Sequence, residues 1–262
     1  MKVGFIGCGN MGGALARAVS QNSQIKVYIS DYNEEKAASF AKEIGAEKSD
    51  NITISKECGF IFLGVKPNVV GSVLEGIKDS LSENENGVLV SMAAGVKLEK
   101  IANFVGEYPV IRIMPNTPVA VGYGMISWCK SPFVTDEAVS AFEEILAGAG
   151  KLLAIDEKLI DAATAVAGCG PAFVYMFTEA LADGAVACGL PRDAALTMAA
   201  QTVLGAAEMI LKSGKHPEKL KDEVCSPGGS TIVGVQALEK GAFRADAAGA
   251  VIAAYEKTKK LG

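Results

Sequence analysis

The stretch Gly7-Cys8-Gly9-Asn10-Met11-Gly12 decides the fold of the first half of the chain. It follows a short apolar run, residues 3–6, that predicts a buried strand, and it opens a helical pattern over residues 11–21. Three glycines at this spacing, between a strand and a helix, match the fingerprint of a dinucleotide-binding turn. The glycines permit the tight turn, a close approach to a pyrophosphate and close helix packing, and the helix N-terminus offers N–H groups to the anion. A glycine-rich turn without a ligand is the alternative.

Asp31 stands where the next expected strand, residues 25–30, comes to an end. In the dinucleotide fingerprint an acidic residue at this place binds the ribose hydroxyls of NAD and repels the 2′-phosphate of NADP. No Arg follows closely, and Lys36 is the nearest cation. The sequence therefore predicts a preference for NADH over NADPH, with the alternative that Asp31 merely caps the next helix.

Strand-like and helix-like segments alternate over the first part of the chain. The expected strands are residues 2–7, 25–30, 60–65, 88–92 and 110–114, and residues 122–129 and 151–155 could complete the sheet. Apolar strands separated by helices predict a parallel sheet covered on both faces. We therefore expect an α/β fold with an N-terminal Rossmann-type parallel sheet, the dinucleotide-binding domain, over residues 1–155.

Strand patterns stop near residue 156. The rest reads as helices over residues 158–166, 172–188, 192–213, 218–224, 231–240 and 243–259. We expect a C-terminal all-α dimerisation and substrate domain over residues 156–262. Residues 172–188 and 192–211 are apolar or small around much of their circumference, so they need burial on all sides. This predicts a homodimer, although richness in Ala also accounts for the 50% hydrophobic composition.

Composition and charge argue against several other classes of protein. The net charge of −5, without a basic run, argues against nucleic acid as the main partner. The longest uncharged stretch, residues 162–178, is short for a membrane span, and no secretory signal is expected. Six dispersed cysteines and a single His leave no metal motif, so we expect no metal, reduced thiols and a cytoplasmic protein. Cys8 lies in the glycine turn, and Cys225 begins the stretch described next. Each of these thiols could be reactive, and buried inert thiols are the alternative.

A second informative stretch is Cys225-Ser226-Pro227-Gly228-Gly229-Ser230-Thr231. Two glycines before a helix can present successive N–H groups to a carboxylate, and the hydroxyls of Ser226, Ser230 and Thr231 add further donors. An ordinary helix N-terminus with hydroxyl caps is the alternative.

Six motifs in order resemble the pyrroline-5-carboxylate reductase family over essentially the whole chain. They are Gly4-Phe5-Ile6-Gly7-Cys8-Gly9-Asn10-Met11-Gly12, Gly64-Val65-Lys66-Pro67, Ser91-Met92-Ala93-Ala94-Gly95, Arg112-Ile113-Met114-Pro115-Asn116-Thr117-Pro118, Ala167-Gly168-Cys169-Gly170-Pro171-Ala172-Phe173 and the Ser-Pro-Gly-Gly stretch. The resemblance implies reduction of the C=N bond of 1-pyrroline-5-carboxylate to L-proline by NADH or NADPH, the last step of proline biosynthesis. It also implies dimers that assemble into a larger ring.

The resemblance further implies roles for individual residues. Ile6 to Met11 would hold the pyrophosphate, Asn51 would contact the adenosine side, and the segments that follow the third and fourth strands would flank the nicotinamide. Together with the fingerprint, the expected cofactor-binding residues are Ile6, Gly7, Cys8, Gly9, Asn10, Met11, Gly12, Asp31, Asn51, Gly64, Val65, Lys66, Pro67, Met92, Ala93 and Ala94. The expected substrate-binding residues are Ser226, Gly228, Gly229, Ser230, Thr231 and Glu157, with Thr231 as the catalytic residue.

The sequence departs from the family at two positions. Cys169 replaces the usual Ser of the Gly-x-Gly-Pro-Ala motif, and we expect it to be a packing position. Many relatives carry Ser or Arg at the end of the second strand, to receive a 2′-phosphate, where this chain has Asp31. This second departure puts a preference for NADPH in doubt.

The poverty of His fits imine reduction. An imine nitrogen can carry its proton before hydride arrives, so a hydroxyl such as that of Thr231 suffices to hold the ring N–H, whereas ketone reductases need a nearby acid. Lys66 remains eligible as an acid, although ribose binding is the alternative for it. Three further hypotheses stay open: a reductase of another cyclic imine, a reductase of a β-hydroxy acid, and a dinucleotide-binding regulator without turnover.

Overall fold

A computed structural model describes residues 1–260. In this range the chain forms an eight-stranded sheet in the order β3-β2-β1-β4-β5-β6-β7-β8. The strands are β1 (Lys2–Ile6), β2 (Lys26–Ser30), β3 (Glu47–Lys48), β4 (Phe60–Leu63), β5 (Val88–Ser91), β6 (Val110–Met114), β7 (Gly124–Lys130) and β8 (Gly150–Ala154). The expected α/β class is confirmed, and β3 is an additional edge strand too short to show a pattern in the sequence.

The sheet is parallel from β3 to β6 and then reverses. Register pairs such as Phe5↔Ile29 and Phe5↔Phe62 align β1 with β2 and β4, whereas β7 pairs antiparallel with β6 and parallel with β8. The carboxyl ends of β1, β2, β4, β5 and β6 therefore share one edge. Strand order reverses between β1 and β4, the kind of switch point where open α/β sheets bind their ligands.

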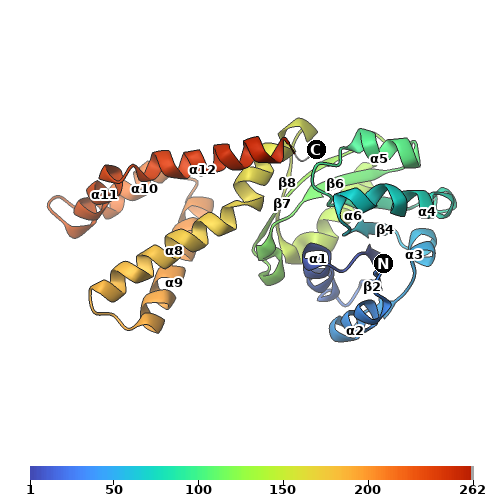
Figure 1. Ribbon diagram of the computed structural model, residues 1–262, viewed down its shortest axis with the longest axis horizontal. Helices are drawn as coiled ribbons and strands as arrows, with labels where there is room; N and C mark the ends of the chain where they lie inside the picture. The colour runs from blue at the N-terminus through green and yellow to red at the C-terminus, as the bar shows by residue number, and fades with distance from the viewer. Residues whose placement is uncertain (261–262) are drawn as a thin grey trace. The chain divides into compact units, whose positions relative to one another are not determined.

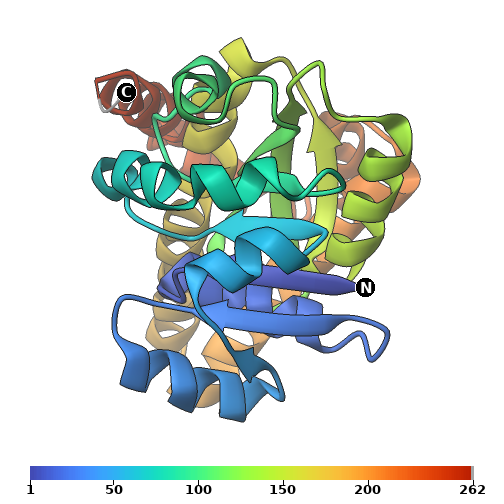
Figure 2. The ribbon, with the colours of Figure 1, turned by 90° about the vertical axis from the view of Figure 1, so that its right-hand side faces the viewer.

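Helices cover both faces of the sheet. They are α1 (Asn10–Ser20), α2 (Glu34–Ile44), α3 (Asn51–Glu57), α4 (Val70–Ser82), α5 (Leu98–Val105) and α6 (Asp136–Leu146). Side chains of α1, α2 and α6 pack on one face with Phe5, Phe62 and Val90, and those of α3, α4 and α5 pack on the other with Ile6 and Leu63. Figure 2 shows α3 and α4, in cyan and teal, crossing in front of the strands. The alternation of strand side chains between two cores fixes the register.

The rest of the described chain is helical. Its helices are α7 (Ile160–Ala163), α8 (Gly170–Ala187), α9 (Arg192–Ser213), α10 (Pro217–Val224), α11 (Ser230–Lys240) and α12 (Phe243–Thr258). The described chain divides into two compact units, one of residues 1–169 and 254–260 and one of residues 170–253. A π-helical turn, Thr164–Gly168, precedes α8.

Within the second unit, α8 and α9 pair side by side (Figure 1). Only small residues are buried between them: Ala182, Ala195 and Ala199. Large apolar side chains remain exposed on the same helices, including Met176 at 70% and Leu211 at 65%. A helix that is apolar all round is stable in water only when other surfaces cover it.

Candidate functional site

A cavity of about 790 Å³ opens where the carboxyl ends of β1, β2 and β4 meet. Its walls come from the glycine turn after β1, the end of β2, the start of α3 and the segment after β4. The lining residues are Ile6, Gly7, Gly9, Ser30, Asp31, Tyr32, Glu34, Asp50, Asn51, Ile52, Gly64, Val65, Lys66, Val69, Ser72, Val73, Gly76 and Ile77. The structure thus brings together eight of the residues expected to bind a cofactor.

The turn after β1 has the backbone that its glycines predict. Gly7 has a φ of +95°, which side chains with a Cβ rarely adopt. A Cβ on Gly12 would overlap the Gly7 carbonyl oxygen, and a Cβ on Gly64 would overlap the same atom. Helix α1 and the end of β4 therefore approach the turn more closely than any other residue type would allow.

Helix α1 leaves its N-terminus open toward the cavity. Gly9 is the N-cap residue, and no side chain caps the helix. A Cβ on Gly9 would meet only the Gly64 carbonyl oxygen, at 4.0 Å, so its lack of a side chain is not required by packing within the protein. Open space beside uncapped N–H groups suits a pyrophosphate, and this part of the cavity fits a dinucleotide.

Asp31 has a different local role from the helix cap considered as its alternative. Helix α2 is capped by Asn33, whose side chain accepts from the Lys36 N–H, whereas Asp31 Oδ1 accepts from the Asn33 N–H at 3.0 Å. Asp31 Oδ2 accepts from the Cys8 N–H at 2.8 Å. Burial of Asp31 disfavours its charge, but the N–H donors of Asn33 and Cys8 outweigh burial and hold the pKa of Asp31 below its usual value. A carboxylate therefore faces the cavity at neutral pH.

The end of the cavity beside Asn51, where adenosine is expected, contains residues that the sequence did not single out. Ser30 is 7% exposed, and its Oγ donates to Asn51 Oδ1 at 2.6 Å, which fixes the amide expected to contact adenosine. Asp50 caps α3 by accepting from the Thr53 N–H at 2.9 Å. Tyr32 is fully exposed at the rim. An Asp-x-x-Thr helix start was a usable signal for Asp50, whereas Tyr32 and Ser30 carry none.

The residues expected to flank the nicotinamide fall into two groups. Val65 and Lys66 line the cavity. Met92 and Ala93 follow β5, and their side chains are buried in the cores on opposite faces of the sheet. These two residues therefore present little side-chain surface, and their expected contact with the cofactor stays a prediction. The roles expected for Pro67 and Ala94 stay predictions.

Glu157 is held inside the first unit. Its Oε1 accepts from the Leu98 N–H at 2.7 Å and from Arg112 Nη1 at 3.0 Å. Arg112 is 1% exposed, so the Glu157 carboxylate provides its counter-charge and joins β6 to the start of α5. These bonds give Glu157 a structural role, and its expected place near the substrate stays a prediction.

The second informative stretch connects α10 to α11 in the second unit. Gly228 has a φ of +70°, and the Gly229 N–H donates back to the Ser226 carbonyl oxygen at 3.0 Å. Gly229 is the N-cap of α11, and no side chain caps this helix. Ser230 and Thr231 are exposed on its first turn. The structure therefore shows no hydroxyl caps, and the first-turn N–H groups and hydroxyls remain free for a ligand.

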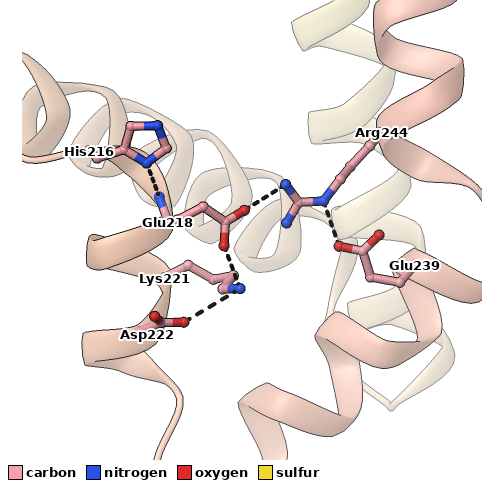
Figure 3. A network of polar contacts seen from close by, with 6 residues as sticks. All are labelled: His216, Glu218, Lys221, Asp222, Glu239 and Arg244. Atoms are coloured by element: carbon pink, nitrogen blue, oxygen red, sulfur yellow. Dashed lines mark hydrogen bonds and ion pairs between the residues drawn. The ribbon is translucent and has the colours of Figure 1, made fainter.

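An ionic network joins the three helices around this stretch (Figure 3). Arg244, at the start of α12, contacts Glu218 of α10 at 2.5 Å and Glu239 of α11 at 2.6 Å. Hydrogen bonds from Lys221 and Arg244 lower the pKa of Glu218 to about 2. His216 caps α10, with Nδ1 accepting from the Glu218 N–H at 3.3 Å. The sole His of the chain therefore has a structural role.

Comparison with known proteins assigns the chain to a family. A model described as pyrroline-5-carboxylate reductase dimerisation matches residues 157–261, and one described as NADP oxidoreductase coenzyme F420-dependent matches residues 2–95. The chain is 42% identical to pyrroline-5-carboxylate reductase of Arabidopsis thaliana over 264 residues, covering 99% of this chain and 95% of that protein. The chain belongs to the pyrroline-5-carboxylate reductase family. The resemblance drawn from the six motifs is thereby confirmed.

Two further relatives extend this comparison. The pyrroline-5-carboxylate reductase of Escherichia coli K12 is 39% identical, covering 99% of this chain and 98% of that protein. The crystal structure of Plasmodium falciparum pyrroline carboxylate reductase with NADP bound superimposes with a TM-score of 0.85 at 36% identity, covering 100% and 98% of the two chains. The pyrroline-5-carboxylate reductase fold thus extends over the whole chain.

Cys8 of this family member should resist alkylation at neutral pH. Burial and the hydrogen bond to Asp31 raise the pKa of its thiol to about 11, the opposite of the lowering that a helix N-terminus can cause. We expect peptide mass spectrometry to show Cys8 reacting with iodoacetamide far more slowly in the native protein than in the denatured protein.

We also expect loss of activity once Cys8 or Cys225 is modified or oxidised. Equal rates at Cys8 in both states, or full activity after verified modification of either residue, would contradict these predictions.

Proposed function

We propose that the protein is a pyrroline-5-carboxylate reductase, which reduces the C=N bond of 1-pyrroline-5-carboxylate to L-proline in the last step of proline biosynthesis. The observation that supports this most is the joint presence of full-length family membership and an intact dinucleotide cavity. We place the reaction in the cytoplasm.

We propose NADH as the preferred cofactor, with NADPH as the other substrate nucleotide. A bound reduced nicotinamide supplies the hydride. The uncapped N-terminus of α1 holds the pyrophosphate, and Asp31 accepts hydrogen bonds from the adenosine ribose hydroxyls. Lys36 Nζ lies 4.0 Å from Asp31 Oδ2 and partly offsets the charge of the carboxylate. The Plasmodium relative was crystallised with NADP bound, so NADPH stays the second cofactor to test.

We propose that the α10–α11 stretch holds the imine. The Gly228 N–H and the open N–H groups of the first turn of α11 after Gly229, with the Ser226 and Ser230 hydroxyls, bind the substrate carboxylate. Thr231 Oγ1 accepts a hydrogen bond from the ring N–H, which keeps the protonated imine oriented for hydride addition at carbon. The protein then needs no separate acid, which agrees with the capping role of its one His.

We propose that residues 1–155 form the dinucleotide-binding domain and residues 156–262 the dimerisation and substrate domain. The first range ends just after β8, the last strand of the described chain, and the dimerisation family model begins at residue 157. Residues 157–187 and 192–213 are long and apolar enough to span a membrane by length and composition alone. The dimerisation model covers both segments, so a subunit interface accounts for their apolar surface.

The protein should sediment as a dimer or as a multiple of dimers. The exposed apolar side chains of α8 and α9 require coverage, and obligate interfaces of this kind bury about 2,000 Å² or more. Analytical ultracentrifugation at micromolar concentration should give twice 27.1 kDa or an even multiple of it. An even multiple above two would support the ring. Met176→Glu, which places a charge in the interface, should shift the protein toward monomer, and a monomeric parent protein would contradict the proposal.

A substrate panel tests the proposed activity. The protein should oxidise NADH with 1-pyrroline-5-carboxylate, and it should not reduce NAD⁺ with a series of β-hydroxy acids. Activity with a β-hydroxy acid or only with another cyclic imine would move the assignment to one of those reductases. Tight NADH binding without turnover of any compound would identify a regulator.

A further inference from the structure

Two backbone N–H groups of the glycine turn donate hydrogen bonds to the end of β2. The Gly7 N–H donates to the Ser30 carbonyl oxygen at 2.7 Å, and the Cys8 N–H donates to Asp31 Oδ2 at 2.8 Å. The first bond joins backbone to backbone and survives any substitution at Ser30. The second depends on one side chain.

The Asp31 carboxylate is held in place from both sides. Cys8 Sγ lies 3.2 Å from Oδ2 and donates its proton there, while the Asn33 N–H donates to Oδ1. Cys8 is 4% exposed, and the Asp31 side chain is 16% exposed. The Cys8 peptide, after β1, and the Asp31 carboxylate, after β2, therefore hold each other in position beside the cavity.

Gly7 gives this bond its importance. Without a Cβ, Gly7 has more backbone freedom than any other residue, and its φ of +95° is only one of several conformations open to it. The N–H group that donates to Asp31 belongs to the Gly7–Cys8 peptide. A charged acceptor on this N–H orients that peptide and, through Cys8, the Gly9 backbone against which a pyrophosphate would lie.

We propose that Asp31 is a positioning residue for the pyrophosphate-binding turn, in addition to reading the adenosine ribose. The inference rests on the proposed binding of a reduced dinucleotide at this turn. The two roles differ in what they require. Reading the ribose needs the ribose hydroxyls of the ligand, whereas positioning the turn strengthens binding of any dinucleotide, with or without those hydroxyls.

A dinucleotide without ribose hydroxyls separates the two roles. The probe is reduced nicotinamide dinucleotide carrying 2′,3′-dideoxyadenosine, and calorimetry measures its Kd with the parent protein and with Asp31→Ser. Loss of a hydrogen bond to a charged group should weaken this probe by about fivefold or more. If Asp31 only reads the ribose, the variant will bind the probe as tightly as the parent, or more tightly because a charge near the pyrophosphate is gone, and the proposal is overturned.

Hydrogen exchange in the cofactor-free protein supplies a readout that does not depend on a ligand. The Cys8 amide should exchange faster in Asp31→Ser than in the parent. Lys36→Met is the matched control, because Lys36 Nζ lies 4.0 Å from the same carboxylate, is half exposed and forms no bond to the turn. Unchanged Cys8 exchange in Asp31→Ser, or an equal rise in Lys36→Met, would overturn the proposal.

Asp31→Asn is a control variant that separates loss of the hydrogen bond from misfolding. It keeps a carbonyl oxygen that can accept from the Cys8 N–H, so it should bind the probe more tightly than Asp31→Ser does. Equal weakening in both variants, with unchanged thermal unfolding, would count against the positioning role. Calorimetry requires no turnover, so failure of the proposed reaction and failure of this inference give different results.

Discussion

Thr231→Ala should lower kcat for 1-pyrroline-5-carboxylate by about tenfold to a hundredfold, because a lost hydrogen bond to a charged group costs about 1.5–3 kcal/mol. Thr231 lies on the first turn of α11, exposed and without a capping bond. Its hydroxyl is therefore free to accept from the ring N–H, which the protonated imine presents as a charged donor. The dinucleotide cavity lies in the other compact unit, so the Kd for NADH should hardly change.

Two further variants make this prediction specific. Thr231→Ser keeps the hydroxyl and should retain most of the activity, whereas Thr231→Val keeps the volume without the hydroxyl and should behave like Thr231→Ala. Steady-state kinetics and NADH titration of all three variants provide the check. Unchanged turnover in folded Thr231→Ala would exclude the role proposed for this residue.

The parent enzyme should favour NADH over NADPH by about tenfold or more in kcat/KM, which corresponds to about 1.4 kcal/mol. The Asp31 carboxylate lines the cavity and stays charged, because its N–H partners lower its pKa. A 2′-phosphate would meet this like charge in a partly solvated site, where repulsion at a few ångströms amounts to about a few kcal/mol before rearrangement. Lys36 offsets part of the repulsion, but its side chain is half exposed.

Asp31→Ser should narrow the gap between the two cofactors chiefly by improving NADPH relative to NADH. Because the bond between Asp31 and Cys8 serves both cofactors, its loss cancels in the ratio, and the ratio isolates the effect of charge and ribose contacts. Measurement of kcat/KM for each cofactor at saturating imine, in both proteins, decides the matter. A parent enzyme that favours NADPH, or an unchanged ratio in the variant, would show that Asp31 does not set the preference.

The parts of the fold that depend on local sequence were predictable. The strand, turn and helix around Gly7 follow from residues that are neighbours in the chain, and α2 is capped by Asn33, a residue type that favours this position. The reversed direction of β7 was missed, because apolar periodicity carries no information on strand direction. The connection from β6 to β7 is short and contains only a 3₁₀ turn, Thr117–Val121. A parallel pair needs a longer crossover, so this length was a signal for antiparallel pairing.

The site was predictable where a motif specifies backbone geometry, and less so where side chains from distant segments meet. The motif after β4 predicted that Lys66 would face the cofactor, and the structure places it in the cavity wall. The bond between Cys8 and Asp31 joins two strand ends, and nothing in either segment indicates the other as its partner. Glu157 was expected near the substrate, but its carboxylate binds buried Arg112. This contact depends on packing between distant segments, which no local pattern describes.

The most direct test of the central claim is to mix the protein with NADH and 1-pyrroline-5-carboxylate and to follow nicotinamide absorbance and proline together. The proposed function predicts that each NADH consumed yields one L-proline, and that Thr231→Ala slows both signals equally. Binding of NADH without formation of proline, under conditions where a known member of the family is active, would contradict it.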